Sequence, residues 1–153
     1  MTKCSTQTEL FPAYKSRKID FDFNGGDITS DAGSLLLRQV DRRIGLTHDL
    51  SKALTDDRRK KSCEHSLQEL LKQRIYGLAL GYEDLNDHKT LRHDLALQTA
   101  VERDEVLASS PTLCRLENSA DRDTAWAISN LLVDRLRLIL AHWVMNYSQC
   151  LQI

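Results

Sequence analysis

Long apolar runs are missing from this chain of 153 residues, and none approaches the roughly 18 to 20 residues that span a bilayer. The N-terminus, MTKCSTQTELFPAYKSRK, also lacks an apolar core of signal-peptide length. These two absences argue against insertion into a membrane and against export. We therefore predict a cytoplasmic protein with no membrane partner.

Paired cysteines are missing as well. The four cysteines stand far apart, at Cys4, Cys63, Cys114 and Cys150, with no CxxC pair. This spacing predicts reduced thiols and not a disulfide framework. Cys63 and His65 could share a metal ion, but a zinc site needs a second pair of ligands that the sequence does not offer.

A strong excess of positive charge is also absent, since the net charge is -1. Proteins that bind DNA through its phosphates are often basic, so any DNA affinity here must come from local patches. The chain is 41% hydrophobic and 28% charged, as soluble globular domains are. Its length fits one domain, and it contains no internal repeat or low-complexity tract.

Hydrophobic periodicity divides the chain into two parts. Residues 1–18 are polar and irregular, and we expect a flexible segment there. Residues 19–153 are expected to form a helical region, preceded by one strand at IDFDF (19–23), where apolar and acidic residues alternate. A turn at Asn24-Gly25-Gly26 would end this strand.

Helix signals dominate the rest of the chain. A first helix from Ser30 or Asp31 to Gly45 should bury one apolar side: Leu35, Leu36, Val40 and Ile44. Shorter helices are expected at 47–54, at 87–92 and after Asp94. Ser66 and Glu69 have the spacing of a capping box, and Ser110-Pro111 is a helix start. A long apolar helix should follow Asp121. The predicted fold class is mainly α.

The only compact basic run is Arg58, Arg59, Lys60 and Lys61. Such a run can contact successive phosphates, which supplies affinity without reading sequence. The alternative interpretation is a solvated loop between helices, because Asp56 and Asp57 directly before the run partly cancel its charge.

SSPTLCRLEN (109–118) has the size of a short helix presented after a turn. In a helix-turn-helix the second helix enters the major groove with its first residues, and Thr112 and Arg115 are the DNA-facing candidates. The alternative is a short packing helix with Leu113 and Leu116 inward and Arg115 paired to Glu117 or Asp121.

EDLNDHKTLRHD (83–94) concentrates acids and histidines. A metal-hydrolase interpretation would combine His93-Asp94 with ligands from His65, His88 or His142. The structural alternative is that Asp84, Asn86 and Asp94 cap helices. No nucleophile with a matching base, glycine-rich phosphate loop or paired-carboxylate arrangement stands out.

Three segments, in order along the chain, carry a resemblance to a known family. They are FNGGDITSDAGSLLLRQVDRR (23–43), HSLQELLKQRIYGLALGYEDLNDHKTLRHDLAL (65–97) and SSPTLCRLEN (109–118). Together they resemble the N-terminal part of bacterial insertion-sequence transposases of DDE transposase group 1. The stretch GYEDLNDHKTLRHD is long and unusual in composition, which argues against a chance match. Lys89, Leu95 and Cys114 depart mildly from the family pattern.

The resemblance implies a cut-and-paste transposase that binds the inverted repeats at the ends of its element. Its RNase H-like core would hold two divalent ions, expected to be Mg²⁺, on Asp, Asp and Glu side chains. No position here matches those acids, so we assign no catalytic and no metal-binding residue. We expect a truncated, catalytically inactive transposase region that precedes the core and binds DNA. The alternative is a stand-alone helical interaction protein that associates with or inhibits an intact transposase. Besides DNA, the expected partners are full-length transposase or a second copy of this chain.

Overall fold

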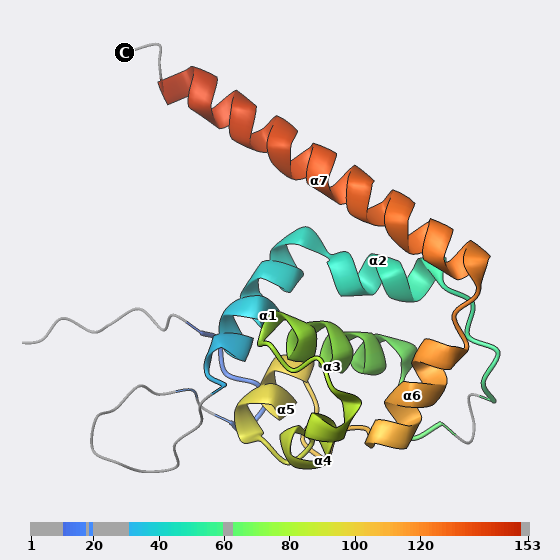
Figure 1. The fold of residues 1–153 in the computed structure, drawn as a ribbon. Coiled ribbons are helices and arrows are strands. Elements are labelled where there is room, and N and C mark those ends of the chain that lie inside the picture. The colour runs from blue at the N-terminus through green and yellow to red at the C-terminus, as the bar shows by residue number, and fades with distance from the viewer. Residues whose placement is uncertain (1–10, 18, 20–30, 60–62, 151–153) are drawn as a thin grey trace, which may run out of the picture.

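The computed structural model describes residues 11–17, 19, 31–59 and 63–150, with the backbone alone from 142 onward. These residues form seven α-helices and one 3-10 helix, and they contain no strand. The mainly α prediction is therefore confirmed (Figure 1). In chain order the helices are α1 (Gly33–Ile44), α2 (Leu46–Ala53), α3 (Leu67–Ala79), η2 (Leu85–Asp87), α4 (His88–Leu91), α5 (Leu95–Val101), α6 (Ser110–Asn118) and α7 (Arg122–Cys150).

The N-terminal expectations fall largely on residues that the structure does not describe. The expected strand lies outside the described residues except for Ile19, and so does the turn at 24–26. The strand therefore stays a prediction. Of the first 18 residues, 11–17 are described, and they contact the end of α5. Phe11 is buried, the hydroxyl of Tyr14 donates to the carbonyl of Glu102, and Arg17 donates to the carbonyl of Asp104 over 2.9 Å.

Several helix ends lie where local chemistry predicts them. The backbone amide of Ser66 donates to the Glu69 carboxylate over 2.7 Å, and the amide of Glu69 donates to the Ser66 hydroxyl over 3.2 Å. This capping box starts α3 and is confirmed. Gly45 ends α1 in the left-handed conformation, with φ of 67°, which glycine adopts without strain. Asp94 caps α5 by accepting from the amide of Leu97.

The buried side of α1 differs from the prediction. Leu36 and Val40, expected in the core, are exposed, whereas Arg38 is only 1% exposed and Asp41 is buried. The reason is that both charged side chains find partners inside. Asp41 accepts hydrogen bonds from Thr47 and from the Tyr76 hydroxyl, and Arg38 donates to the carbonyl of Pro12 over 3.2 Å.

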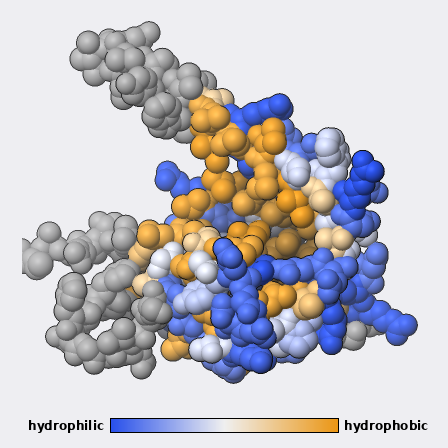
Figure 2. Space-filling view, viewed as in Figure 1, coloured by the Kyte–Doolittle hydropathy of each residue, from blue (hydrophilic) through white to orange (hydrophobic). Residues whose placement is uncertain are grey.

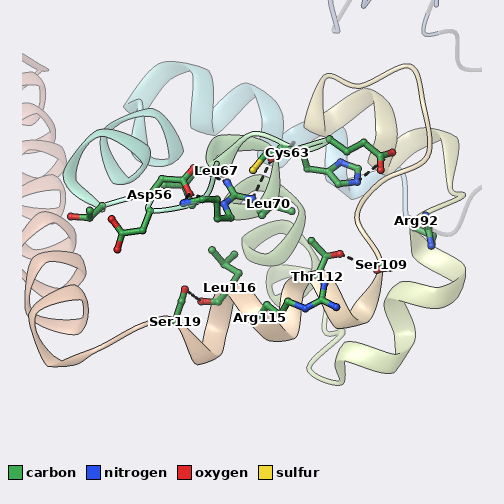
Figure 3. A pocket seen from close by; sticks show the side chains of 15 residues that line it. Asp56, Cys63, Leu67, Leu70, Arg92, Ser109, Thr112, Arg115, Leu116 and Ser119 are labelled. Atoms are coloured by element: carbon green, nitrogen blue, oxygen red, sulfur yellow. Dashed lines mark hydrogen bonds and ion pairs between the residues drawn. The ribbon is translucent and has the colours of Figure 1, made fainter. Parts of the chain in front are cut away.

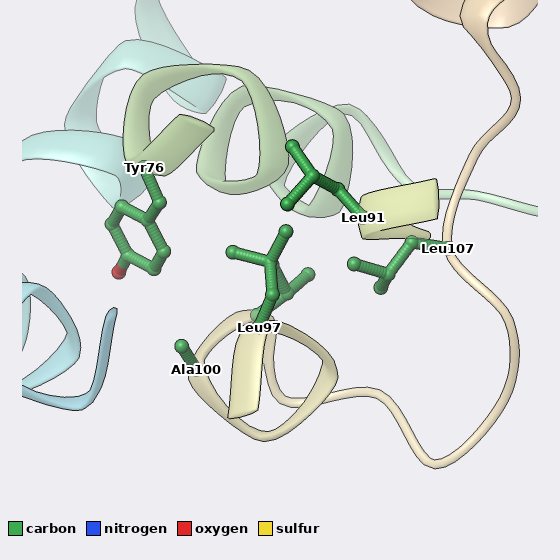
Figure 4. Close-up of a cluster of buried hydrophobic side chains, with 6 residues drawn as sticks. Tyr76, Leu91, Leu97, Ala100 and Leu107 are labelled. Carbon is green, nitrogen blue, oxygen red and sulfur yellow. The ribbon is translucent and has the colours of Figure 1, made fainter. Parts of the chain in front are cut away.

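The main hydrophobic cluster lies between α3, α4 and α5 (Figure 4). Tyr76 enters it from α3, and the remaining members come from the segments around α4, α5 and the loop after α5: Leu91, Leu97, Ala100, Val101 and Leu107. Burial raises the pKa of the Tyr76 phenol, and the neighbouring Asp41 carboxylate adds to the effect. The phenol therefore stays protonated and donates to Asp41.

Glu102, at the end of α5, gathers cations from two other helices. Its carboxylate lies 2.5 Å from Nζ of Lys72 in α3, 2.5 Å from Nη2 of Arg42 and 3.5 Å from Nε of Arg38, both in α1. Burial raises the pKa of the Glu102 carboxyl, but the contacts with Lys72 and Arg42 outweigh it and hold that pKa below its ordinary value. One carboxylate thus joins α1, α3 and α5.

Gln73 fixes the chain just before α6. Its amide nitrogen donates to the carbonyl of Ala108 and its amide oxygen accepts from the Ala108 amide, both over 2.9 Å. The same nitrogen lies 3.2 Å from Nδ1 of the buried His88. His88 fits there because Gly77 has no side chain, since a Cβ at that position would lie 3.0 Å from the His88 ring.

The long helix α7 crosses α2 and then continues away from the body of the protein (Figure 1). Ile128 and Leu131 pack with Leu50 of α2, and Arg135 donates to the carbonyl of Ile44 over 2.8 Å and pairs with Asp49. The outer part of the helix has no such anchor among the described residues. Within the described part of the chain, no helix is long and apolar enough to cross a membrane.

Replacing Glu102 by Gln should lower the free energy of unfolding by about 2 to 3 kcal/mol, because three partly buried cations lose their common counter-charge. Urea denaturation measures the change. Glu105→Gln, which breaks one exposed pair with Arg103, is the control and should stay close to wild type. Equal losses in the two variants would contradict the role given to Glu102.

His88 should make the fold sensitive to acid. Burial lowers the pKa of its imidazole below the ordinary 6.5, and the nearby Arg74 lowers it further. Unfolded His88 therefore binds a proton that the folded state excludes, so stability is fully present above pH 6.5 and decreases as the pH falls below it.

The free energy of unfolding, measured by urea denaturation between pH 6.5 and about pH 5, should fall less steeply in His88→Gln than in wild type. Some slope remains, because burial and Arg103 also lower the pKa of His65. His93→Gln, at an exposed position, is the control and should keep the wild-type slope. A His88→Gln slope equal to that of wild type would refute the assignment.

Candidate nucleic-acid interface

A pocket of about 720 Å³ lies between the loop before α3, the first turn of α3 and helix α6 (Figure 3). We call it the α6 pocket. Figure 3 shows Asp56, Cys63 and Leu67 on one side of it, and Thr112, Arg115 and Leu116 on the other. Its lining residues are Thr55, Asp56, Asp57, Arg58, Cys63, Glu64, His65, Leu67, Leu70, Arg92, Ser109, Thr112, Arg115, Leu116 and Ser119.

Helix α6 is oriented by its buried side. Pro111 stands in its first turn, where the missing backbone N–H leaves no donor unpaired. Leu113 is fully buried and packs with Leu70 and Ala108. Because residues one and two positions away point to other sides of a helix, Thr112 and Arg115 line the pocket. The predicted inward position of Leu113 is confirmed, and Leu116 is half-buried.

Arg115 is exposed, and among the described residues no ion pair or hydrogen bond holds its guanidinium group. The alternative pairing with Glu117 is wrong, because Glu117 lies 2.5 Å from Nε of Arg74 instead. Asp121 is also engaged, since it caps the backbone amide of Thr124 over 2.8 Å. Arg115 therefore presents an unneutralised charge at the α6 pocket.

Thr112 is held by its neighbour at the start of the helix. Its hydroxyl lies 3.0 Å from the hydroxyl of Ser109, and either group can be the donor. Both side chains line the α6 pocket. A hydroxyl has two acceptor lone pairs in addition to its hydrogen, so this pair retains capacity for a further hydrogen bond.

Arg58 builds the opposite wall of the pocket. Its Nε and Nη2 atoms donate to the two carboxylate oxygens of Asp56 over 2.6 and 2.8 Å, and Nη1 donates to the carbonyl of His65. The hydrogen bond with Asp56 raises the pKa of Arg58. The sequence predicted that the acids before the basic run partly cancel its charge, and Asp56 does so through this direct bidentate pair with Arg58. Arg59 is exposed, and Lys60 and Lys61 lie outside the described residues.

The lining of the pocket is balanced in charge. Its three arginines are Arg58, Arg92 and Arg115, and its three acids are Asp56, Asp57 and Glu64. Arg92 is not among the site residues predicted from the sequence, because its segment, residues 83–94, predicted only metal ligands and helix caps. Its Nε atom is buried without a hydrogen-bond partner in the described structure. No local sequence signal places Arg92 in the pocket, because only the fold brings residue 92 close to α6.

The histidines proposed for a metal site lie in different surroundings. His88 is completely buried beside Gln73, His93 is exposed, and His65 lines the α6 pocket with Cys63. Burial and the nearby Arg103 lower the pKa of His65, so its ring is neutral at pH 7. Among the described residues, no three His, Cys, Asp or Glu side chains group as metal ligands would. The side chain of His142 lies outside that description.

Comparison with protein families identifies the class to which this chain belongs. The model of the family described as transposase DDE domain group 1 matches residues 11–150. Because the match covers most of the sequence, the chain belongs to this family, and the resemblance found in the sequence is confirmed. Comparisons with curated proteins and with solved structures give no match.

The family's chemistry implies divalent metal ions, and the described acids do not fit such a site. Two-metal catalysis needs several carboxylates with oxygens free to converge on the ions. Among the described residues, no group of three or more His, Cys, Asp or Glu side chains could hold a metal ion, and the carboxylates of Glu102 and Asp56 are already bound by Lys72, Arg42 and Arg58. No catalytic step is therefore assigned to any described residue.

Proposed function

We propose that this chain is a DNA-handling region of a cut-and-paste transposase, which binds the inverted repeats of its insertion sequence through the α6 pocket. The observation that supports this proposal most directly is that the guanidinium group of Arg115 is exposed to solvent and has no partner among the described residues. Membership of the transposase family supports DNA as the ligand. The metal-dependent strand transfer of the family is not placed on any residue of this chain.

The chemistry of the pocket fits a helix that approaches duplex DNA. A guanidinium group can donate two parallel hydrogen bonds to a phosphate or to a guanine edge. The Thr112 hydroxyl lies about one turn before Arg115 in α6, and Ser109 is the N-cap residue of the helix, so both hydroxyls lie near the helix start, where phosphate or base contacts are made in helix-turn-helix proteins. Arg92 adds another guanidinium to the same pocket, in addition to Arg58, which Asp56 neutralises.

The balanced lining sets the expected strength of binding. Asp57 is exposed in the pocket wall and would face the phosphates, so it opposes binding. Asp56 has a different effect, because it already neutralises Arg58. We therefore expect modest affinity that depends strongly on salt, with Arg115 as the main contributor from the described residues.

Fluorescence anisotropy with an inverted-repeat duplex, measured over a range of salt concentrations, tests the proposal. Arg115→Gln should weaken binding by about 1 to 2 kcal/mol, roughly a 5- to 30-fold rise in Kd. If Arg115 contacts a phosphate, the loss should be equal for a scrambled duplex and the salt slope should fall by about 1. Asp57→Asn should tighten binding, because it removes a carboxylate from the pocket wall.

Arg137→Gln is the matched control, since it removes the same charge from an α7 side chain that is 76% exposed. It should leave the Kd near the wild-type value. Arg115→Gln should also retain wild-type stability, because no partner in the described structure is lost. The proposal fails if the wild-type chain binds no duplex, or if Arg115→Gln and Arg137→Gln weaken binding equally.

A second candidate function is association with an intact transposase, which would inhibit transposition. The large apolar surface of α7 favours it. Co-elution of the two purified proteins in size-exclusion chromatography tests this candidate. Salt dependence separates it from DNA binding, because packing of apolar surfaces does not weaken with salt as phosphate contacts do.

A further inference from the structure

The two ring nitrogens of the buried His88 lie in different surroundings. Nδ1 is 3.2 Å from the side-chain nitrogen of Gln73, whereas Nε2 is buried without a hydrogen-bond partner in the described structure. A Cβ at Gly77 would lie 3.2 Å from Nε2, so this nitrogen faces the backbone of α3. Among the described residues, the ring is therefore joined to another side chain by a hydrogen bond at Nδ1 alone. The hydrophobic surface that Figure 2 shows along α7 lies elsewhere in the molecule.

The carboxamide of Gln73 has one favourable orientation in its surroundings. Its oxygen accepts from the backbone amide of Ala108, and its nitrogen donates to the carbonyl of the same residue, both over 2.9 Å. If the carboxamide were turned over, its oxygen would face the carbonyl of Ala108 and its N–H groups would face the amide of Ala108, so both bonds would be lost. In the observed orientation, the second hydrogen of the Gln73 nitrogen is available to Nδ1 of His88.

A hydrogen bond from Gln73 requires a lone pair on Nδ1 of His88. A neutral imidazole has a lone pair on Nδ1 only when its proton is on Nε2. If Nδ1 carried a proton, two N–H groups would face each other over 3.2 Å, and the Gln73 carboxamide would have to turn over to accept from the ring. We propose that His88, as the neutral imidazole with its proton on Nε2, is a positioning residue that orients Gln73 and, through Ala108, the start of α6.

This chain of contacts ends at the α6 pocket. Ala108 directly precedes Ser109, the N-cap residue of α6, and both Ser109 and Thr112 line the pocket. The orientation of one buried carboxamide therefore influences where the hydroxyl groups of the pocket lie. The consequence for DNA binding rests on the proposed function of the pocket, whereas the orientation of Gln73 does not.

The charged groups around His88 favour the neutral ring. Burial lowers the pKa of its imidazole, and Arg74 of α3 lowers it further. Asp87 of η2 and Glu117 of α6 act in the opposite direction and do not reverse the shift. The ring is therefore neutral at pH 7. Acid adds the proton that turns Nδ1 from an acceptor into a donor, which opposes the observed orientation of Gln73.

Nitrogen NMR of the imidazole rings in the full chain without DNA, at about pH 7.5, tests the assignment. His88 should be neutral with its proton on Nε2. The exposed His93 provides the reference for a solvated ring in the same sample. A proton on Nδ1 of His88 would overturn the proposal, whether or not the chain binds DNA.

Two substitutions separate the acceptor from the volume of the ring. His88→Asn keeps an acceptor oxygen close to the position of Nδ1 and does not titrate, whereas His88→Leu fills much of the space and accepts nothing. Hydrogen exchange of the Ala108 amide should accelerate about 3- to 10-fold in His88→Leu, as the loss of one hydrogen bond implies, and stay within about twofold of wild type in His88→Asn. The amide of Gln98, which donates to the carbonyl of Asp94 in α5, is the internal control and should be unchanged.

Equal acceleration at Ala108 in the two variants would contradict the role of the Nδ1 acceptor. If His88→Leu does not fold, the NMR assignment and the pH dependence of His88→Asn still decide the question.

Fluorescence anisotropy with an inverted-repeat duplex gives the functional readout. Between pH 7 and about pH 5.5, the Kd of the wild-type chain should rise relative to that of His88→Asn. Protonation of His65 in the pocket acts in the opposite sense, but it is common to both proteins and cancels in the comparison. Parallel pH profiles would overturn the positioning role. Absence of DNA binding in both proteins would refute the proposed function and leave the NMR and exchange tests to decide the orientation of Gln73.

Discussion

Three consecutive polar residues in the middle of α3, namely Lys72, Gln73 and Arg74, determine how the surrounding elements are arranged. Lys72 and Gln73 are buried and Arg74 is largely so, and a polar group without a partner in such a place is costly. Successive side chains on a helix point about 100° apart, so the three must find partners in different directions. Lys72 binds the end of α5 at Glu102, Gln73 binds the backbone before α6, and Arg74 binds Glu117 within α6.

These contacts link the core to the α6 pocket. Gln73 holds Ala108, one residue before the cap of α6, and thereby fixes where the helix starts. Because Arg74 engages Glu117, no acid on α6 remains to neutralise Arg115. Arg115 therefore keeps its charge unpaired because Arg74 of α3 forms the ion pair with Glu117. On the other side, Glu102 draws Arg38 inward, and α1 turns Leu36 and Val40 outward.

The sequence predicted the features that depend on neighbouring residues. The end of α1 at Gly45 and the capping box of Ser66 are local, so they could be read directly. The buried side of α1 could not be predicted from the sequence, because the burial of Arg38 depends on its ion pair with Glu102, which lies 64 positions later in the chain. The same holds for the site. Arg58 and Arg115 lie in separate segments that only the fold brings to one pocket, and Arg92 joins them from a third.

The most direct test of the DNA-binding account is the alkylation rate of two cysteines, followed by peptide mass spectrometry with and without an inverted-repeat duplex. Cys63 lines the α6 pocket, whereas Cys114 is exposed on α6 outside it. The account predicts that saturating DNA slows the alkylation of Cys63 and leaves that of Cys114 unchanged. An unchanged rate at Cys63, or equal protection of both thiols, would contradict it.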